Sequence, residues 1–110
     1  MVTQYIAIQI ARDFIDDLKN SGIKLRMAYL YGSFARNSYH EDSDIDLALI
    51  ADEFTGVGFV DVSMFTGVLK NYSRIQPKTF STEYFYKGDP FVDEIIKSGI
   101  EIPVNVSISQ

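Results

Sequence analysis

Residues 27–50, MAYLYGSFARNSYHEDSDIDLALI, constrain the fold more than any other stretch of the chain. An apolar run ends at Gly32-Ser33, ten residues follow, and Asp44-Ile45-Asp46 then opens a second apolar run that continues to Ile50. Apolar runs of this length, bounded by turn residues, are typical of buried strands. The sequence therefore predicts two strands, with a small turn after the first and two carboxylates at the start of the second.

The spacing of the two aspartates points to a metal ion. Asp44 and Asp46 are two residues apart, so on a strand their side chains share a face, with Cα atoms roughly 6.5 to 7 Å apart. Carboxylates of this kind select Mg²⁺ or Mn²⁺, and magnesium takes its remaining ligands from water and substrate phosphates. We therefore expect the pair to hold a divalent cation together with a nucleotide.

The turn supplies groups that suit a phosphate. Gly32 has no side chain where a phosphate approaches the backbone, and Ser33 offers a hydroxyl and an amide at the start of a predicted short helix over 32–36. Arg36, one helical turn further, is placed to reach a phosphate oxygen or an acidic group of a partner. Each half of the pattern is common alone as a turn or a strand end, but both together favour a site for a magnesium-bound nucleoside triphosphate.

Composition narrows the remaining possibilities. The chain has 110 residues, enough for a single domain over 1–110, with no cysteine and one histidine, His40, so metal ligands must be oxygens. The net charge of −5 opposes attraction to nucleic-acid backbones, and we expect no direct nucleic-acid binding. Neither a secretory signal pattern nor a run of about 18 apolar residues occurs, so we expect a soluble cytoplasmic protein.

Periodicity and capping residues predict the other elements. Helices are expected over 3–20, capped by Thr3, over 59–71, and over 89–99, capped by Asp89. Their inward-facing residues are expected to include Ile6, Ile10, Phe14, Leu18, Val60, Met64, Phe65, Phe91, Ile95 and Ile96. Strands are expected over 25–31, 44–50, 72–76 and 100–106, with Pro77 ending the third, whereas 78–88 cannot be assigned by pattern. Strands alternating with helices predict a mixed α/β fold, a small mixed sheet flanked by about four helices.

The paired motif resembles a known signature. Gly32-Ser33, ten residues and Asp44-Ile45-Asp46 inside apolar strands are similar to the polymerase-beta-type nucleotidyltransferase superfamily. The string GSFARNSYHEDSDIDLALI most resembles its smallest members, the minimal nucleotidyltransferases called MNT or MntA-like proteins, and the similarity covers nearly the whole chain. The resemblance implies ATP as donor, two divalent cations, Gly32 and Ser33 at the phosphates, and Asp44 and Asp46 as catalytic metal ligands.

The resemblance also implies a partner. Minimal nucleotidyltransferases are typically encoded beside a helical HEPN-domain protein and form a toxin–antitoxin pair with it. The chain would be the antitoxin, neutralising the HEPN ribonuclease by binding it and by transferring AMP from Mg-ATP to a tyrosine hydroxyl of the toxin.

One position departs from the family. The family places a third carboxylate on the next strand, where this chain has Gln76, whose carbonyl can ligate but which brings no charge and acts poorly as a base. Glu83, seven residues further, reaches that place only if the chain turns back.

Two alternatives stay open: a weak or inactive nucleotidyltransferase-like module that inhibits its partner by occlusion, and a small-molecule nucleotidyltransferase completed by a partner subunit. A hetero- or homo-oligomer is expected in each case, because so small a fold cannot enclose both donor and acceptor.

Overall fold

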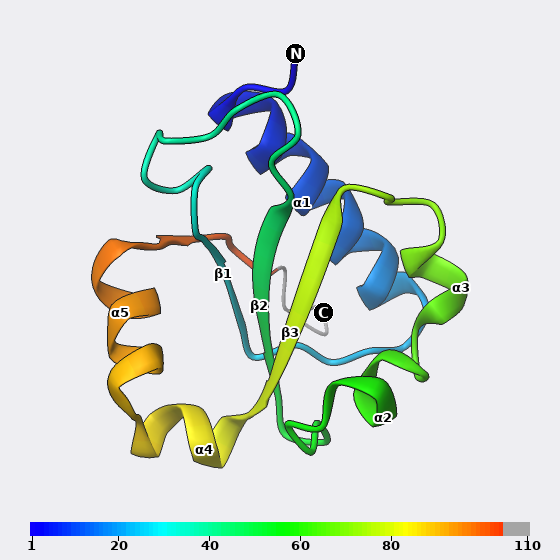
Figure 1. The fold of residues 1–110 in the computed structure, drawn as a ribbon. Coiled ribbons are helices and arrows are strands. Elements are labelled where there is room, and N and C mark those ends of the chain that lie inside the picture. The colour runs from blue at the N-terminus through cyan, green and yellow to red at the C-terminus, as the bar shows by residue number, and fades with distance from the viewer. Residues whose placement is uncertain (105–110) are drawn as a thin grey trace, which may run out of the picture.

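A four-stranded mixed sheet lies at the centre of the computed structural model, which describes residues 1–104 (Figure 1). Its strands are β1 (Met27–Tyr31), β2 (Ile45–Ala51), β3 (Ile75–Ser81) and β4 (Ile100–Glu101), in the spatial order β3-β2-β1-β4. β2 pairs antiparallel with β1 and parallel with β3, and β4 pairs antiparallel with β1. The predicted mixed α/β fold with a small mixed sheet is confirmed.

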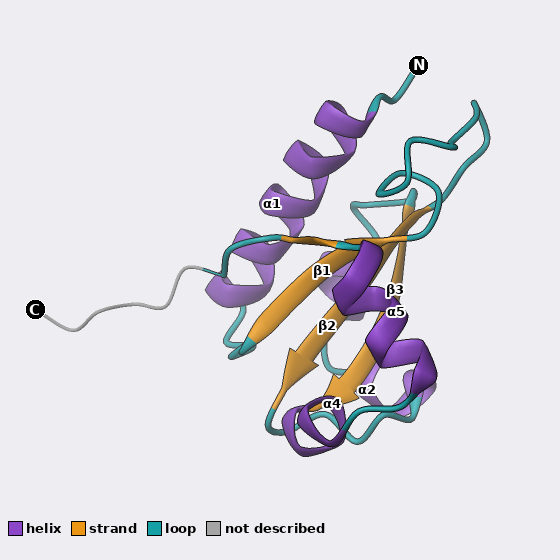
Figure 2. Cartoon of the chain, turned by 90° about the vertical axis from the view of Figure 1, so that its left-hand side faces the viewer, coloured by secondary structure: helices purple, strands orange, loops and turns teal. Residues whose placement is uncertain are grey.

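Helices cover both faces of this sheet. They are α1 (Gln4–Asn20), α2 (Gly58–Val62), α3 (Thr66–Leu69), α4 (Thr82–Lys87) and α5 (Pro90–Ser98). α1 lies on one face, and α4 and α5 lie on the other (Figure 2). Leu47 and Leu49 of β2 belong to the cluster under α1, whereas Ala48 and Ile50 belong to the cluster under α4 and α5. β2 is therefore the covered central strand that its apolar run predicts.

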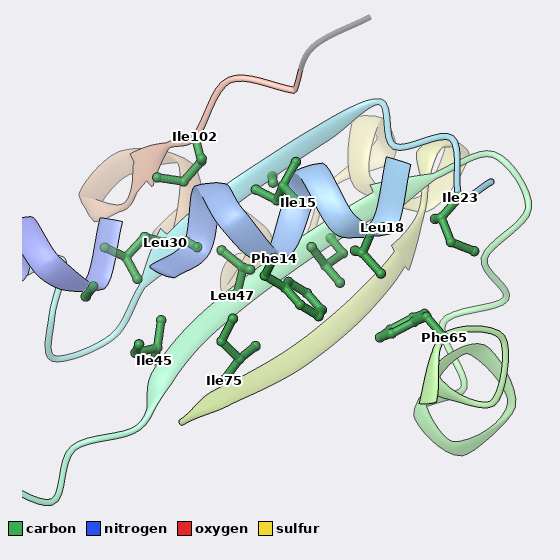
Figure 3. Packing of buried hydrophobic residues seen from close by; sticks show 14 of the residues in the cluster. Phe14, Ile15, Leu18, Ile23, Leu30, Ile45, Leu47, Phe65, Ile75 and Ile102 are labelled. Carbon is green, nitrogen blue, oxygen red and sulfur yellow. The ribbon is translucent and has the colours of Figure 1, made fainter. Parts of the chain in front are cut away.

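α1 anchors the larger cluster. Phe14, Ile15 and Leu18 point toward the sheet (Figure 3), and the Phe14 ring lies 5.2 Å from that of Tyr72. The predicted Thr3 cap is confirmed, because its hydroxyl accepts from the Ile6 amide at 3.2 Å. Ile6 itself is 40% exposed and not inward-facing as predicted, since the sheet contacts the helix face that carries the two alanines Ala7 and Ala11.

The predicted single helix over 59–71 is wrong, because two short helices with a break between them occupy the segment. Phe65 leaves helical geometry, with φ −140° and ψ 28°, and its buried ring packs 6.1 Å from Phe14. The polar Asp61 is buried in place of Val60 and Met64, which are 42% and 43% exposed. Burial of one polar side chain and one aromatic ring thus overrides the apolar periodicity.

The third strand is longer than predicted. β3 begins at Ile75 and continues through Pro77 to Ser81, after which α4 follows directly. Pro77 does not end it, because β3 lies at the edge of the sheet, where a missing N–H is tolerated. Of the predicted last strand over 100–106, β4 occupies two residues and residues 102–104 are not strand, while positions 105–106 lie outside the described residues.

The ends of α5 are as predicted, but its buried face is not. The Asp89 side chain caps the helix by accepting from the Val92 amide at 2.7 Å, and Gly99 follows its end. Val92 and Ile95 are the buried residues, while Phe91 is 42% and Ile96 48% exposed.

Between residues 1 and 104 no helix has both the length and the apolar character that a membrane span requires.

Candidate functional site

The turn after β1 is a single bend and not the predicted short helix. Gly32 has φ +77°, and its carbonyl accepts from the Arg36 amide at 3.1 Å, while the Ser33 carbonyl accepts from the Ser38 amide at 2.9 Å. Asn37 then adopts a left-handed backbone conformation, with φ 58°. The segment therefore forms one hydrogen-bonded turn between two residues of positive φ, and no helix follows from it.

This bend lies against the second carboxylate of the motif. A Cβ atom added to Gly32 would come within 2.3 Å of Asp46 Oδ2. A contact that short would force the Asp46 carboxylate to move, so glycine at this position suits both the positive φ and the present place of that carboxylate. The structure therefore brings the Gly32-Ser33 bend and the Asp46 carboxylate side by side, as the two halves of the motif predict.

Asp46 is the middle of a row across three strands. The register places it opposite Tyr31 on β1 and opposite Gln76 on β3. Paired residues of neighbouring strands project from the same face of a sheet, so the three side chains share one face. Gln76 is exposed and stands where the family resemblance expects a third carboxylate. Glu83 lies in α4, beyond the other end of β3, so the chain does not turn back to replace it.

The charges at this row are coupled. Partial burial raises the pKa of Asp46, the neighbouring Asp44 carboxylate raises it further, and the Arg36 guanidinium lowers it in part. Burial, with a smaller effect of Asp46, raises the pKa of Tyr31 to about 12, so its hydroxyl stays protonated. Asp44, just before β2, is exposed, and Arg36 is exposed at the end of the bend. The charges of Asp44 and Arg36 therefore lie close enough to the Asp46 carboxylate to affect its pKa.

Tyr31 is the residue that sequence reasoning does not place here, since it reads as a sheet aromatic. The signal for its placement is its position directly before Gly32, at the end of β1. Because β1 and β2 are antiparallel, the end of β1 pairs with the start of β2, and Tyr31 therefore lies opposite Asp46.

The donor set suits one hard cation better than two. Within residues 1–104 no cluster of three or more His, Cys, Asp or Glu side chains is arranged to hold a metal ion. Two carboxylates, Asp44 and Asp46, supplemented by the Gln76 carbonyl, match the habit of Mg²⁺ to keep waters and to bind substrate phosphates.

A cavity of about 830 Å³ lies at the Ser81 end of β3, and none of Tyr31, Asp46 and Gln76 lines it. Its lining includes the aromatic rings of Phe80, Tyr84 and Phe91 and the ammonium group of Lys78, which lies 5.9 Å from the centre of the Phe91 ring. Phe91 also packs edge-on against Tyr31 at 5.7 Å, so the two aromatic rings connect the cavity to the carboxylates.

Comparison with known proteins fits this geometry. The sequence profile of the family "Polymerase beta, Nucleotidyltransferase" matches residues 14–105, and the chain belongs to that family. Members of the family typically use a divalent metal and a nucleoside triphosphate. None of the curated proteins searched matches the chain.

Three solved structures share the fold at low identity. A Sulfolobus solfataricus protein described as a nucleotidyltransferase has a TM-score of 0.66 and 19% identity, over 89% of this chain and 80% of that one. A toxin–antitoxin with AMP-PNP has a TM-score of 0.60 and 18% identity, over 86% and 73%. The toxin–antitoxin MntA-HpeT, carrying two aspartate-to-glutamate substitutions, has a TM-score of 0.57 and 16% identity, over 84% and 71%.

Proposed function

We propose that the chain is a nucleotidyltransferase antitoxin that binds Mg-ATP at the Gly32-Ser33 bend and transfers AMP to a tyrosine hydroxyl of a HEPN-domain toxin. The observation that carries the proposal is the contact between bend and carboxylate, where a Gly32 side chain would meet Asp46. It supports a site in which the bend binds the phosphates and the neighbouring carboxylate binds the metal ion. The likeness to two toxin–antitoxin structures, one with AMP-PNP and one altered at two aspartates, supports the choice of partner and nucleotide.

Each residue has a task in this proposal. Gly32 and Ser33 bind the β- and γ-phosphates through backbone and hydroxyl groups, and Arg36 pairs with a phosphate oxygen. Asp44 and Asp46 hold Mg²⁺ or Mn²⁺, which when bound neutralises phosphate charge. The toxin's tyrosine oxygen forms a bond to the α-phosphorus, the bond to pyrophosphate breaks, and the phenolic proton passes to water, because Gln76 cannot accept it.

Incubation of the protein with ATP labelled at the α-phosphate and with the product of an adjacent HEPN-type gene tests the transfer. Label is expected on the toxin with wild type and not with Asp44→Asn or Asp46→Asn. A toxin that stays unlabelled with wild type, although the nucleotide binds, would remove catalysis from the proposal.

Gln76 favours a second function, inhibition of the toxin by binding alone. A neutral side chain at this place gives the site less negative charge for a cation and no base for the acceptor hydroxyl. Gln76→Glu separates the two functions. If this variant labels the toxin and wild type does not, while both inhibit it equally, the protein acts by occlusion.

A further inference from the structure

Arg74, the residue before β3, holds the backbone on both sides of Asp44. Its guanidinium donates to the Ser43 carbonyl at 2.8 Å through one terminal nitrogen and at 3.2 Å through Nε, and to the Glu41 carbonyl at 3.1 Å. On the other side, the Ile45 amide donates to the Arg74 carbonyl at 2.8 Å. Asp44 lies between Ser43 and Ile45, so a single residue fixes both of its peptide neighbours.

The loop that carries Asp44 depends on this contact. Ser43 is buried, and its hydroxyl accepts from the His40 amide at 2.9 Å, which closes a turn over residues 40–43. Asp44 itself lies outside β2 and is exposed, so no strand pairing of its own fixes it. The guanidinium links this turn to the sheet, and its rigid planar fork holds the two carbonyls in a fixed geometry that a flexible lysine side chain does not impose.

We propose that Arg74 is a positioning residue that fixes the Asp44 carboxylate for the cation, an inference that rests on the proposed function. A ligand held before the ion arrives binds it more tightly, and loss of such a supporting contact typically weakens metal binding about 10–100-fold. Charge alone predicts the opposite effect, because removing a positive group near the site favours a divalent cation. The sign of the change in affinity therefore separates positioning from electrostatics.

The experiment measures Mn²⁺ affinity in the presence of a nonhydrolysable ATP analogue for wild type, Arg74→Gln and Arg74→Lys. Arg26→Gln is the matched control, because it removes an arginine paired with the exposed Asp52 at the other end of β1 and β2. We expect Arg74→Gln to bind Mn²⁺ at least about 10-fold more weakly, Arg74→Lys to be intermediate and the control to be unchanged. Unchanged or tighter binding by Arg74→Gln overturns the inference and leaves the proposed function intact.

Amide exchange without any metal gives an independent readout. We expect the Ile45 amide to exchange faster in Arg74→Gln than in Arg26→Gln, although its own acceptor, the Arg74 carbonyl, is retained. If wild type binds no Mn²⁺, the proposed function fails, and this exchange rate alone decides whether Arg74 fixes the Asp44 backbone. Equal rates in the two variants would show that it does not.

Discussion

At the scale of single residues, Gly32 joins backbone conformation to the chemistry of the site. Its positive φ allows the chain to bend directly after β1, and its missing side chain admits the Asp46 carboxylate. Gly22 offers a natural comparison, since its φ is +99° and a Cβ there would meet nothing within 4 Å. The two glycines therefore share a positive φ and differ in the contact that a side chain would make.

Gly32→Ala and Gly22→Ala are each expected to lower the free energy of unfolding by about 1–2 kcal/mol, the strain of a side chain in the left-handed region. Gly32→Ala alone should abolish binding of an ATP analogue with Mn²⁺, because its methyl group displaces Asp46. Urea unfolding and isothermal titration measure the two quantities. Equal nucleotide binding by both variants would show that the bend does not adjoin the nucleotide.

At the scale of elements, Asp61 fastens α2 to the sheet. This buried carboxylate accepts hydrogen bonds from the Thr55 amide and hydroxyl, the Gly56 amide and the Thr79 hydroxyl of β3, at 2.7–3.0 Å. Burial by itself would raise the pKa of Asp61, but these hydrogen bonds hold it below the ordinary value of 3.8. The negative form thus stabilises the fold.

Asp61→Asn should reduce the free energy of unfolding by about 2–3 kcal/mol at pH 7, because an amide donor would face the donors of Gly56 and Thr79. A lowered pKa in the folded state means that the stabilisation is complete above pH 3.8 and is lost as the pH falls through the lower folded value. Urea unfolding from pH 7 to pH 2 should show the two proteins converging below pH 3.8. A constant difference between them would contradict this role.

The elements also show what the sequence can and cannot predict. The caps at Thr3 and Asp89 and the apolar runs of β1 and β2 are local signals, and the structure confirms them. The motif also predicts the Gly32–Asp46 contact, because Gly32 follows the end of β1 and Asp46 lies at the start of the adjacent strand β2. The burial of Asp61 and the passage of β3 through Pro77 depend instead on partners distant in the chain, and the placement of Tyr31 depends on register.

At the scale of the whole molecule, charge opposes binding to polyanions. The sequence has 10 basic and 15 acidic residues, which gives a net charge of −5. A nucleotide that brings its own magnesium avoids this repulsion.

Fluorescence anisotropy with a labelled single-stranded RNA should accordingly show no binding at protein concentrations up to about 10 µM, near the affinity of nonspecific binding proteins at physiological salt. Lowering the salt concentration should not produce RNA binding, because the protein offers few positively charged side chains to displace counterions from the RNA. Binding that strengthens steeply at low salt would instead indicate a basic surface that overcomes the net charge.

A crystal structure of the protein with Mn²⁺ and a nonhydrolysable ATP analogue, with anomalous data for manganese, tests the central claim most directly. The account predicts a manganese peak bonded to the carboxylates of Asp44 and Asp46, with the phosphates against Gly32 and Ser33. Manganese away from both aspartates, or a nucleotide held only in the cavity between Lys78 and Tyr84, would contradict it.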